Sequence, residues 1–148
     1  GAERALARTI WTGEELVEFL AASCRNKEDF SKMYYDFQEG LQKAFKKSLD
    51  AAEFPQTEEE MIVAQADALG DTNYFINGTA AEMGINLSDI TSIIHQANMS
   101  KLFTAEDGTK YVKYDETNGN KVMKSPEFFR PEENLKAYIA EKRELATK

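Results

Sequence analysis

The sequence predicts an all-α fold, a helical bundle of four principal helices with a small C-terminal β-hairpin and a terminal helix. One observation is that apolar residues recur at intervals of three and four over several long stretches, as in amphipathic helices. The other is a change of composition after Phe103, where the turn dipeptides Asp107-Gly108 and Asn118-Gly119 flank the strand-forming run Tyr111–Tyr114. We expect the tight turn of the hairpin at Asn118-Gly119.

Length and composition indicate one domain, residues 1–148, with the hairpin and tail at about 104–148. A chain of 148 residues can bury one core, and a hydrophobic fraction of 42% excludes general disorder. The formal charge of −8 disfavours binding to nucleic acid, which needs a basic stripe. It is compatible with a nucleotide ligand, because metal ions can screen phosphate from carboxylates.

The absence of targeting signals in this sequence favours a cytoplasmic setting. No apolar run approaches the ~18 residues of a membrane span, so no membrane association is expected, and no signal peptide is visible at the start. Cys24 is the single cysteine, which rules out an intrachain disulfide. With His95 as the single histidine, a thiolate zinc site is not indicated.

The first two principal helices are placed by start signals and apolar periodicity. Thr12 is a suitable N-cap, with Glu15 three residues on as its capping-box partner. A second start signal falls at Asn26–Asp29. From Phe30 onwards apolar residues recur at helical spacing, so we expect this helix to run to about Leu49.

The remaining helices have their own start and stop signals. Thr57 caps the third helix, which continues to Met83 and is stopped by Gly84. Ser88 is the best N-cap for the fourth helix. A final helix is expected from Glu132 to about Arg143.

Asp67 and Asp71 are four residues apart in the third helix, so both carboxylates project from one face. The same face reaches back to Glu60 and forward to Tyr74. Carboxylates in an apolar stripe are costly unless a cation compensates them, and a hard divalent ion with oxygen ligands is the usual compensator. Glu60 is only a candidate ligand, since helix capping already explains the acids of the first turn. Solvated acids at the edge of the stripe are the open alternative.

His95, Asn98 and Lys101 recur at a spacing of three in the fourth helix. This spacing places an imidazole, an amide and an ammonium group on one polar face, a set suited to a base, a ribose or a polyphosphate. An ordinary solvent-exposed face would have the same pattern, so both interpretations stand at this point.

Three motifs stand in a fixed order. Residues 67–85 read D-A-L-G-D-x-x-Y-x-x-x-G-x-A-x-x-x-G-I, residues 95–102 read H-x-A-N-M-S-K-L, and residues 121–131 read K-V-M-K-S-P-E-F-F-R-P. The first two resemble motifs of the MazG and phosphoribosyl-ATP pyrophosphohydrolase superfamily of all-α nucleoside triphosphate pyrophosphohydrolases. The third is similar to the K-V-x-K-G-P-x-F-x-P-P tail of its shorter members. The resemblance covers Asp67 to Pro131, about half of the chain.

This resemblance implies hydrolysis of a nucleoside triphosphate between the α- and β-phosphates, giving the monophosphate and pyrophosphate. It further implies Mg²⁺ or Mn²⁺ as cofactor and a homodimer or homotetramer as assembly. Carried over to this sequence, it implies that Glu39, Asp67 and Asp71 are catalytic and bind the metal, with Glu60 as a further metal ligand. The substrate-binding residues that we expect are His95, Asn98, Lys101, Tyr74, Phe128 and Phe129.

The chain departs from the family at its first acidic motif, E-E-x-x-E. Aligned with residues 38–42, this motif retains only Glu39, because Gln38 and Gln42 stand at two acidic positions. A glutamine can offer Mg²⁺ a neutral oxygen but no charge, so the site is expected to be weaker or built differently. The alternative function is therefore a catalytically weakened relative that binds a nucleotide or a partner protein without turnover. The preferred base and sugar, and a housecleaning or biosynthetic role, are not indicated.

Overall fold

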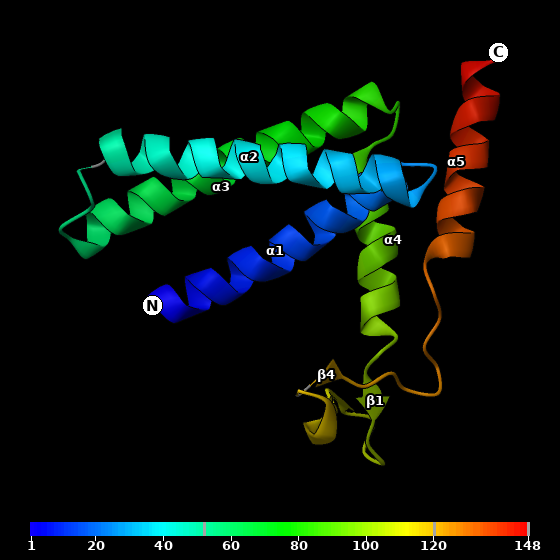
Figure 1. The fold of residues 1–148 in the computed structure, drawn as a ribbon. Coiled ribbons are helices and arrows are strands. Elements are labelled where there is room, and N and C mark those ends of the chain that lie inside the picture. Colours follow the sequence, from blue (N-terminus) through cyan, green and yellow to red (C-terminus); the bar gives the residue numbers. More distant parts are fainter. Residues whose placement is uncertain (52, 120, 148) are drawn as a thin grey trace. The chain divides into compact units, whose positions relative to one another are not determined.

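Residues 1–51, 53–119 and 121–147 are described by the computed structural model, and over these ranges the chain forms five α-helices and four short strands (Figure 1). The predicted all-α class is confirmed, with small strands after the fourth helix and a terminal helix. The helices are α1 (Ala2–Ala22), α2 (Lys27–Ala51), α3 (Glu58–Glu82), α4 (Leu87–Met99) and α5 (Glu132–Ala146). The strands are β1 (Phe103–Thr104), β2 (Lys110–Tyr111), β3 (Tyr114–Asp115) and β4 (Lys121–Val122), and the 3-10 helix η1 spans Glu116–Asn118.

The chain divides into two compact units, Gly1–Gln56 and Thr57–Lys148. The first unit consists of α1 and α2, and the Cys24 Sγ atom at the end of α1 lies 3.2 Å from the Met33 Sδ atom of α2. The second unit holds α3, α4, the strands and α5. The single domain expected from the sequence stays a prediction.

The first helix starts well before its predicted N-cap. α1 begins at Ala2, and Thr12 lies inside it, where its hydroxyl donates to the Arg8 carbonyl at 3.0 Å. The predicted start at Thr12 is wrong because the preceding residues, beginning with Ala2–Leu6, are strong helix formers that extend the helix upstream. A threonine inside a helix satisfies its hydroxyl on the carbonyl four residues back, so it does not have to cap.

The predicted starts of α2 and α3 and the predicted stop of α3 are confirmed. The Asn26 Oδ1 atom accepts from the Asp29 backbone N–H at 2.8 Å. Thr57 and Glu60 form the capping box, in which each side chain accepts from the other residue's backbone N–H at 3.2 Å. Gly84 follows the end of α3 with φ +70°, a left-handed conformation that glycine adopts without strain.

The fourth helix is capped by Asn86, and the predicted cap at Ser88 is wrong. The Asn86 side chain accepts from the Ser88 backbone N–H at 2.9 Å, so α4 begins at Leu87. Asn and Ser are about equally good caps. Asn86 is the residue with the extended backbone that an N-cap needs (φ −94°, ψ 116°).

Two small β-ribbons follow α4 where one hairpin was expected. β3 pairs antiparallel with β4 across the predicted Asn118-Gly119 turn, in which Gly119 has φ +64°. The additional ribbon pairs β1 with β2 around Asp107-Gly108. There the Thr109 backbone N–H donates to the Asp107 carboxylate at 2.9 Å, which holds the pKa of Asp107 below its usual range.

α4 is held at both ends within the second unit. At its start, the Tyr138 hydroxyl of α5 accepts from the Asn86 N–H at 3.0 Å and donates to the Asp89 carboxylate at 3.1 Å. At its end, the Ser125 hydroxyl donates to the Ser100 carbonyl at 2.8 Å. Figure 1 accordingly shows the β-ribbons beyond the C-terminal end of α4.

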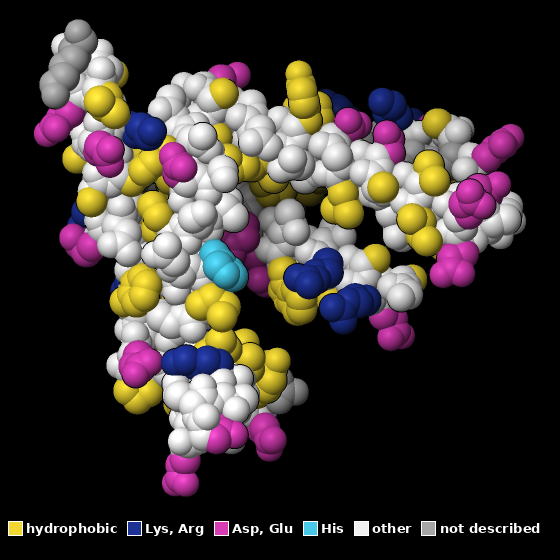
Figure 2. All heavy atoms as spheres, turned by 180° about the vertical axis from the view of Figure 1, so that it is seen from behind, with side chains coloured by type: hydrophobic (Ala, Val, Ile, Leu, Met, Phe, Trp, Pro, Cys, Tyr) yellow, Lys and Arg dark blue, Asp and Glu magenta, His cyan; other side chains and the backbone are white. Residues whose placement is uncertain are grey.

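Each unit leaves much apolar surface uncovered, and Figure 2 shows apolar side chains spread over the visible face. Ala80 and Ala97 are the buried hydrophobic residues of the described chain. On α3, Leu69, Tyr74 and Phe75 are exposed by 70%, 76% and 71%. No helix in the described part of the chain is both long and apolar enough to cross a membrane.

Candidate functional site

Asp67 and Asp71 lie on the surface of α3, one helical turn apart. Both side chains are exposed, and within residues 1–51, 53–119 and 121–147 neither carboxylate makes a hydrogen bond or an ion pair. Tyr74 is equally free to meet a ligand, since its only close ring contact in that part of the chain is Phe75 at 6.1 Å. The two carboxylates form an acid pair that is available to a cation.

The other two predicted acids are engaged locally. Glu60 uses its carboxylate in the capping box of α3. Glu39 lies on α2, in the first unit, where its Oε1 atom is 2.6 Å from the Lys43 Nζ atom. Both side chains of this ion pair are well exposed, so the pair can open at little cost. The neighbouring Gln38 donates its amide to the Tyr34 hydroxyl at 3.3 Å.

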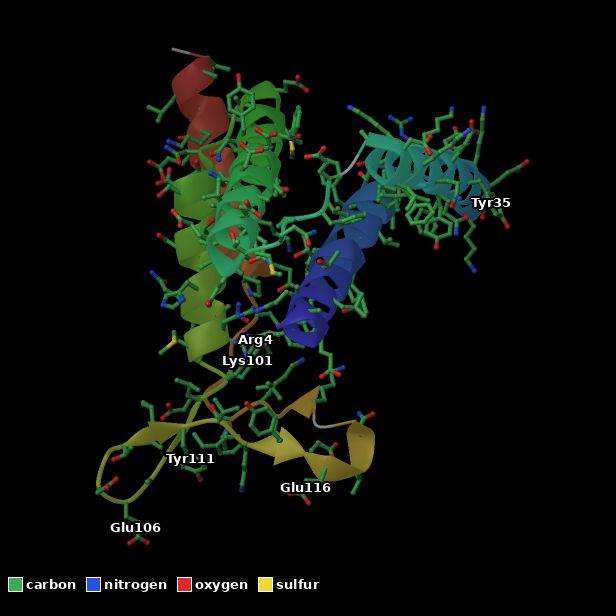
Figure 3. The ribbon with its side chains drawn as sticks, turned by 90° about the vertical axis from the view of Figure 1, so that its left-hand side faces the viewer. Arg4, Tyr35, Lys101, Glu106, Tyr111 and Glu116 are labelled. Atoms are coloured by element: carbon green, nitrogen blue, oxygen red, sulfur yellow. The ribbon has the colours of Figure 1, made fainter. Side chains whose placement is uncertain are left out.

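Asn98 and Lys101 come together at the C-terminal end of α4. The Lys101 ammonium donates to the Asn98 Oδ1 atom at 2.7 Å, and the Lys101 backbone N–H donates to the Asn98 carbonyl at 3.1 Å. Figure 3 shows Lys101 where α4 meets the β-ribbons. The pair forms a polar group with a positive charge at its tip.

Phe128 and Phe129 lie in the loop after β4, beside the same end of α4. The Phe129 backbone N–H donates to the Ser100 hydroxyl at 3.2 Å. Phe128 is half-buried, and the Lys124 Nζ atom lies 4.8 Å from the centre of its ring, a cation–π distance. The loop that carries both phenylalanines is thus bonded to Ser100, the residue before Lys101.

His95 lines a cleft of about 590 Å³ between α3 and α4. Its imidazole is exposed, and it is the cyan side chain of Figure 2. The cleft is lined by amide, hydroxyl and imidazole side chains with one apolar residue, and no Asp, Glu, Lys or Arg lines it. The lining residues are Asn73, Asn77, Leu87, Ser88, Thr91, Ser92, His95 and Gln96.

Apart from His95, none of the cleft residues was expected to belong to a site from the sequence. Their signal is nevertheless present in the sequence. Asn73 and Asn77 are four residues apart in an otherwise apolar part of α3, and Ser88 and Thr91 share helical spacing with His95 on α4. The Asn77 amide donates to the Asn73 side-chain oxygen at 3.0 Å, which orients both amides.

The cleft and the acid pair lie on different faces of α3. At about 100° per residue, Asn73 and Asn77 are about 200° and 240° round the helix axis from Asp71. Among the described residues, no hydrogen bond or ion pair joins the acid pair to His95 or to the Asn98–Lys101 group. The predicted site residues of the second unit therefore form separate groups: the acid pair, the His95 cleft, and the polar and aromatic group at the end of α4.

The acid pair has the chemistry that a hard divalent cation requires. Mg²⁺ is commonly bound by one or two carboxylates together with water and substrate phosphates. Over the part of the chain that the structure describes, no group of three or more His, Cys, Asp or Glu side chains could hold a metal ion.

Comparisons with known proteins define the class. A crystal structure described as a "putative NTP pyrophosphohydrolase" from Exiguobacterium sp. 255-15 matches with a TM-score of 0.87 and 37% sequence identity, over 99% of this chain and 83% of that chain. The fold is thus shared with an all-α nucleotide pyrophosphohydrolase candidate. The phosphoribosyl-ATP pyrophosphohydrolase family matches residues 2–98, and the chain belongs to this family. The resemblance expected from the motifs is confirmed. Among curated proteins there is no match.

Proposed function

We propose that this protein is a metal-dependent nucleoside triphosphate pyrophosphohydrolase that releases the monophosphate and pyrophosphate. The observation that carries the proposal is the acid pair, Asp67 and Asp71, which has no partner among the described residues and lies on a helix of a chain that belongs to a pyrophosphohydrolase family. Phosphoryl chemistry depends chiefly on positioning and on charge stabilisation rather than on a covalent step by the protein. A cation bound by these carboxylates would contribute to both the positioning and the charge stabilisation.

Each group has a proposed role. Asp67 and Asp71 would hold Mg²⁺ or Mn²⁺, with Glu60 as a candidate further ligand. When bound, such an ion neutralises phosphate oxygens and lowers the pKa of a bound water. Lys101 offsets the negative charge on the departing pyrophosphate, and the 2.7 Å hydrogen bond to Asn98 restricts where its ammonium can lie.

The uncharged part of the nucleotide has two candidate contacts. Phe128 and Phe129 lie in the loop whose backbone is bonded to Ser100 at the end of α4, so we propose that a base stacks on one of these rings. His95 faces the neutral cleft, which suits a sugar or a base edge better than a phosphate, because residues 57–100 contain no Lys or Arg. Tyr74 offers a third aromatic surface, next to the acid pair.

We also propose that the protein works as a homodimer or homotetramer. Met61, Ile62 and Val63 are consecutive residues of α3, so they face different sides of the helix, and all three are exposed. Exposed apolar side chains on several sides of one helix form a surface that is normally covered by another element or another chain. A symmetric second copy is the commonest way to cover such a surface.

The test is pyrophosphate release from a panel of nucleoside triphosphates, with Mg²⁺ or Mn²⁺ and with a chelator. We expect release with metal and none with the chelator. If no triphosphate on a broad panel yields pyrophosphate with either metal, the proposed function is wrong.

A nucleotide-binding relative without turnover is the second candidate. Gln38 and Gln42 stand where the family has acids, and Glu39 is paired with Lys43 at 2.6 Å. Calorimetric binding of a triphosphate without pyrophosphate release would favour this candidate.

A further inference from the structure

Ser125 is buried, with 7% of its surface exposed, and its hydroxyl is fully used. The hydroxyl donates to the Ser100 carbonyl at 2.8 Å and accepts from the Glu127 backbone N–H at 3.1 Å. A buried polar group that makes all its hydrogen bonds fixes the segments that it joins. Here those segments are the end of α4 and the loop Ser125–Phe129, and we call their contact the α4–loop junction.

The junction satisfies carbonyls that the end of a helix leaves without partners. The Ser125 backbone N–H donates to the Lys101 carbonyl at 3.2 Å, while the Ser125 hydroxyl serves Ser100. In return, the Ser100 hydroxyl accepts from the Phe129 N–H at 3.2 Å and donates to the Ala97 carbonyl at 2.7 Å. The hydroxyl of each serine thus bonds to the backbone of the other segment: Ser125 to the end of α4, and Ser100 to the loop.

The junction restrains Lys101 on both sides. Its backbone N–H is bound to the Asn98 carbonyl, and its carbonyl is bound to Ser125. A residue just past a helix end usually frays, and these bonds remove that freedom. The Lys101 side chain thus starts from a restrained backbone, and its ammonium donates a hydrogen bond to the Asn98 side chain.

We infer that Ser125 is a positioning residue, which holds Lys101 in place for binding the polyphosphate of the substrate. The inference rests on the proposed function and deepens it.

The experiment compares Ser125→Ala with the parent protein. Calorimetry gives the affinity for inorganic tripolyphosphate, steady-state kinetics give KM and kcat for a triphosphate, and hydrogen exchange reports the Glu127 and Phe129 amides. We expect tripolyphosphate binding to weaken and KM to rise by about fivefold or more, with kcat changed far less, since a lost hydrogen bond loosens Lys101 without removing it. Both amides should exchange faster.

Two further variants sharpen the comparison. Ser31→Ala, which removes a hydroxyl bonded to the Lys27 carbonyl in α2, is the matched control and should leave every value unchanged. Ser125→Gly keeps the backbone bond to Lys101 while removing the hydroxyl, so it repeats the test if Ser125→Ala does not fold.

The outcomes separate this inference from the proposed function. Faster amide exchange with unchanged tripolyphosphate affinity and unchanged KM overturns the inference, because the junction would then open without effect on phosphate. A parent protein that binds tripolyphosphate in a Ser125-dependent way but releases no pyrophosphate keeps the positioning role and loses the catalytic proposal. A parent protein that releases pyrophosphate from a nucleoside triphosphate but binds no tripolyphosphate overturns the inference and leaves the proposed function standing.

Discussion

At the scale of single residues, the proposed chemistry depends on side chains that contribute little to the stability of the fold. Asp67 and Asp71 are exposed and have no partner among the described residues, whereas Glu60 caps a helix and Glu39 pairs with Lys43. Substituting a residue of the acid pair should therefore change function without changing the fold. Substituting Glu60 would change the stability of α3 together with any effect on function, because Glu60 is part of the helix cap.

Asp71→Asn should lower turnover by about a hundredfold or more, because losing a metal ligand raises the barrier by several kcal/mol and each ~1.4 kcal/mol is a factor of ten. The fold should survive, and without metal the melting midpoint should stay the same or rise slightly, since a carboxylate beside Asp67 is gone. Activity and metal-free melting are measured on the same preparation. A variant that melts earlier yet, while folded, turns over at the parental rate would show that Asp71 is architectural.

Lys101→Ala should weaken binding of a triphosphate more than binding of the matching monophosphate. The reason is that the proposed partner of the ammonium is the departing pyrophosphate group. Calorimetry with both ligands measures the difference, and Lys136→Ala, which removes an exposed lysine paired with Glu133 on α5, is the matched control. Equal losses for the two ligands would move Lys101 to the sugar, the α-phosphate or a structural role.

At the scale of the elements, local signals predicted the helices well and their starts less well. The capping box at Thr57 and the left-handed Gly84 bound α3 as expected. Thr12 and Ser88 failed as caps because a cap is chosen in competition with neighbouring residues. Upstream helix formers extended α1 past Thr12, and Asn86 took the cap of α4.

The ties between elements could not be predicted, because they join residues far apart in the sequence. The Tyr138 hydroxyl bridges the Asn86 N–H and the Asp89 carboxylate, 52 and 49 residues away. Ser125 reaches Ser100 across 25 residues. Neither bond leaves a periodic signal, since each depends on how the chain folds back on α4.

Tyr138→Phe should destabilise the second unit by about 1 kcal/mol, because it removes the hydroxyl that holds α5 to the start of α4. In a chain of this size that corresponds to a fall of about 2–4 °C in the melting midpoint. The matched control is Tyr35→Phe, since Tyr35 is 68% exposed and its hydroxyl makes no hydrogen bond within the described residues. Equal midpoints for the two variants would mean that the Tyr138 bridge contributes nothing.

At the scale of the whole molecule, the sequence could predict which candidate residues lie close together only within a single helix. Asp67 with Asp71, and Asn98 with Lys101, are neighbours through helical spacing, and their role in a site stays a prediction. The cleft around His95 was not, because it needs α3 and α4 to meet, and that meeting is set by the turn at Gly84 and by the packing of both helices. Helical periodicity likewise cannot predict how these groups would contact one substrate, because it relates residues within a single helix.

The exposed apolar residues of α3 lead to a prediction about assembly. Light scattering should give a mass of two or four chains of 16.7 kDa, since burial of apolar surface drives association. Leu69→Glu, which places a charge on the exposed apolar surface of α3, should shift the mass towards one chain. A parent protein that is monomeric at working concentration and fully active would contradict the proposed oligomer.

We propose that the acid pair supports cleavage between the α- and β-phosphates. Phosphorus NMR of one nucleoside triphosphate, incubated with the protein and Mg²⁺, follows every product directly. We expect the monophosphate and pyrophosphate to appear together in equal amounts, and Asp71→Asn to slow both by about a hundredfold. A nucleoside diphosphate with orthophosphate, or parental rates from Asp71→Asn, would contradict this proposal.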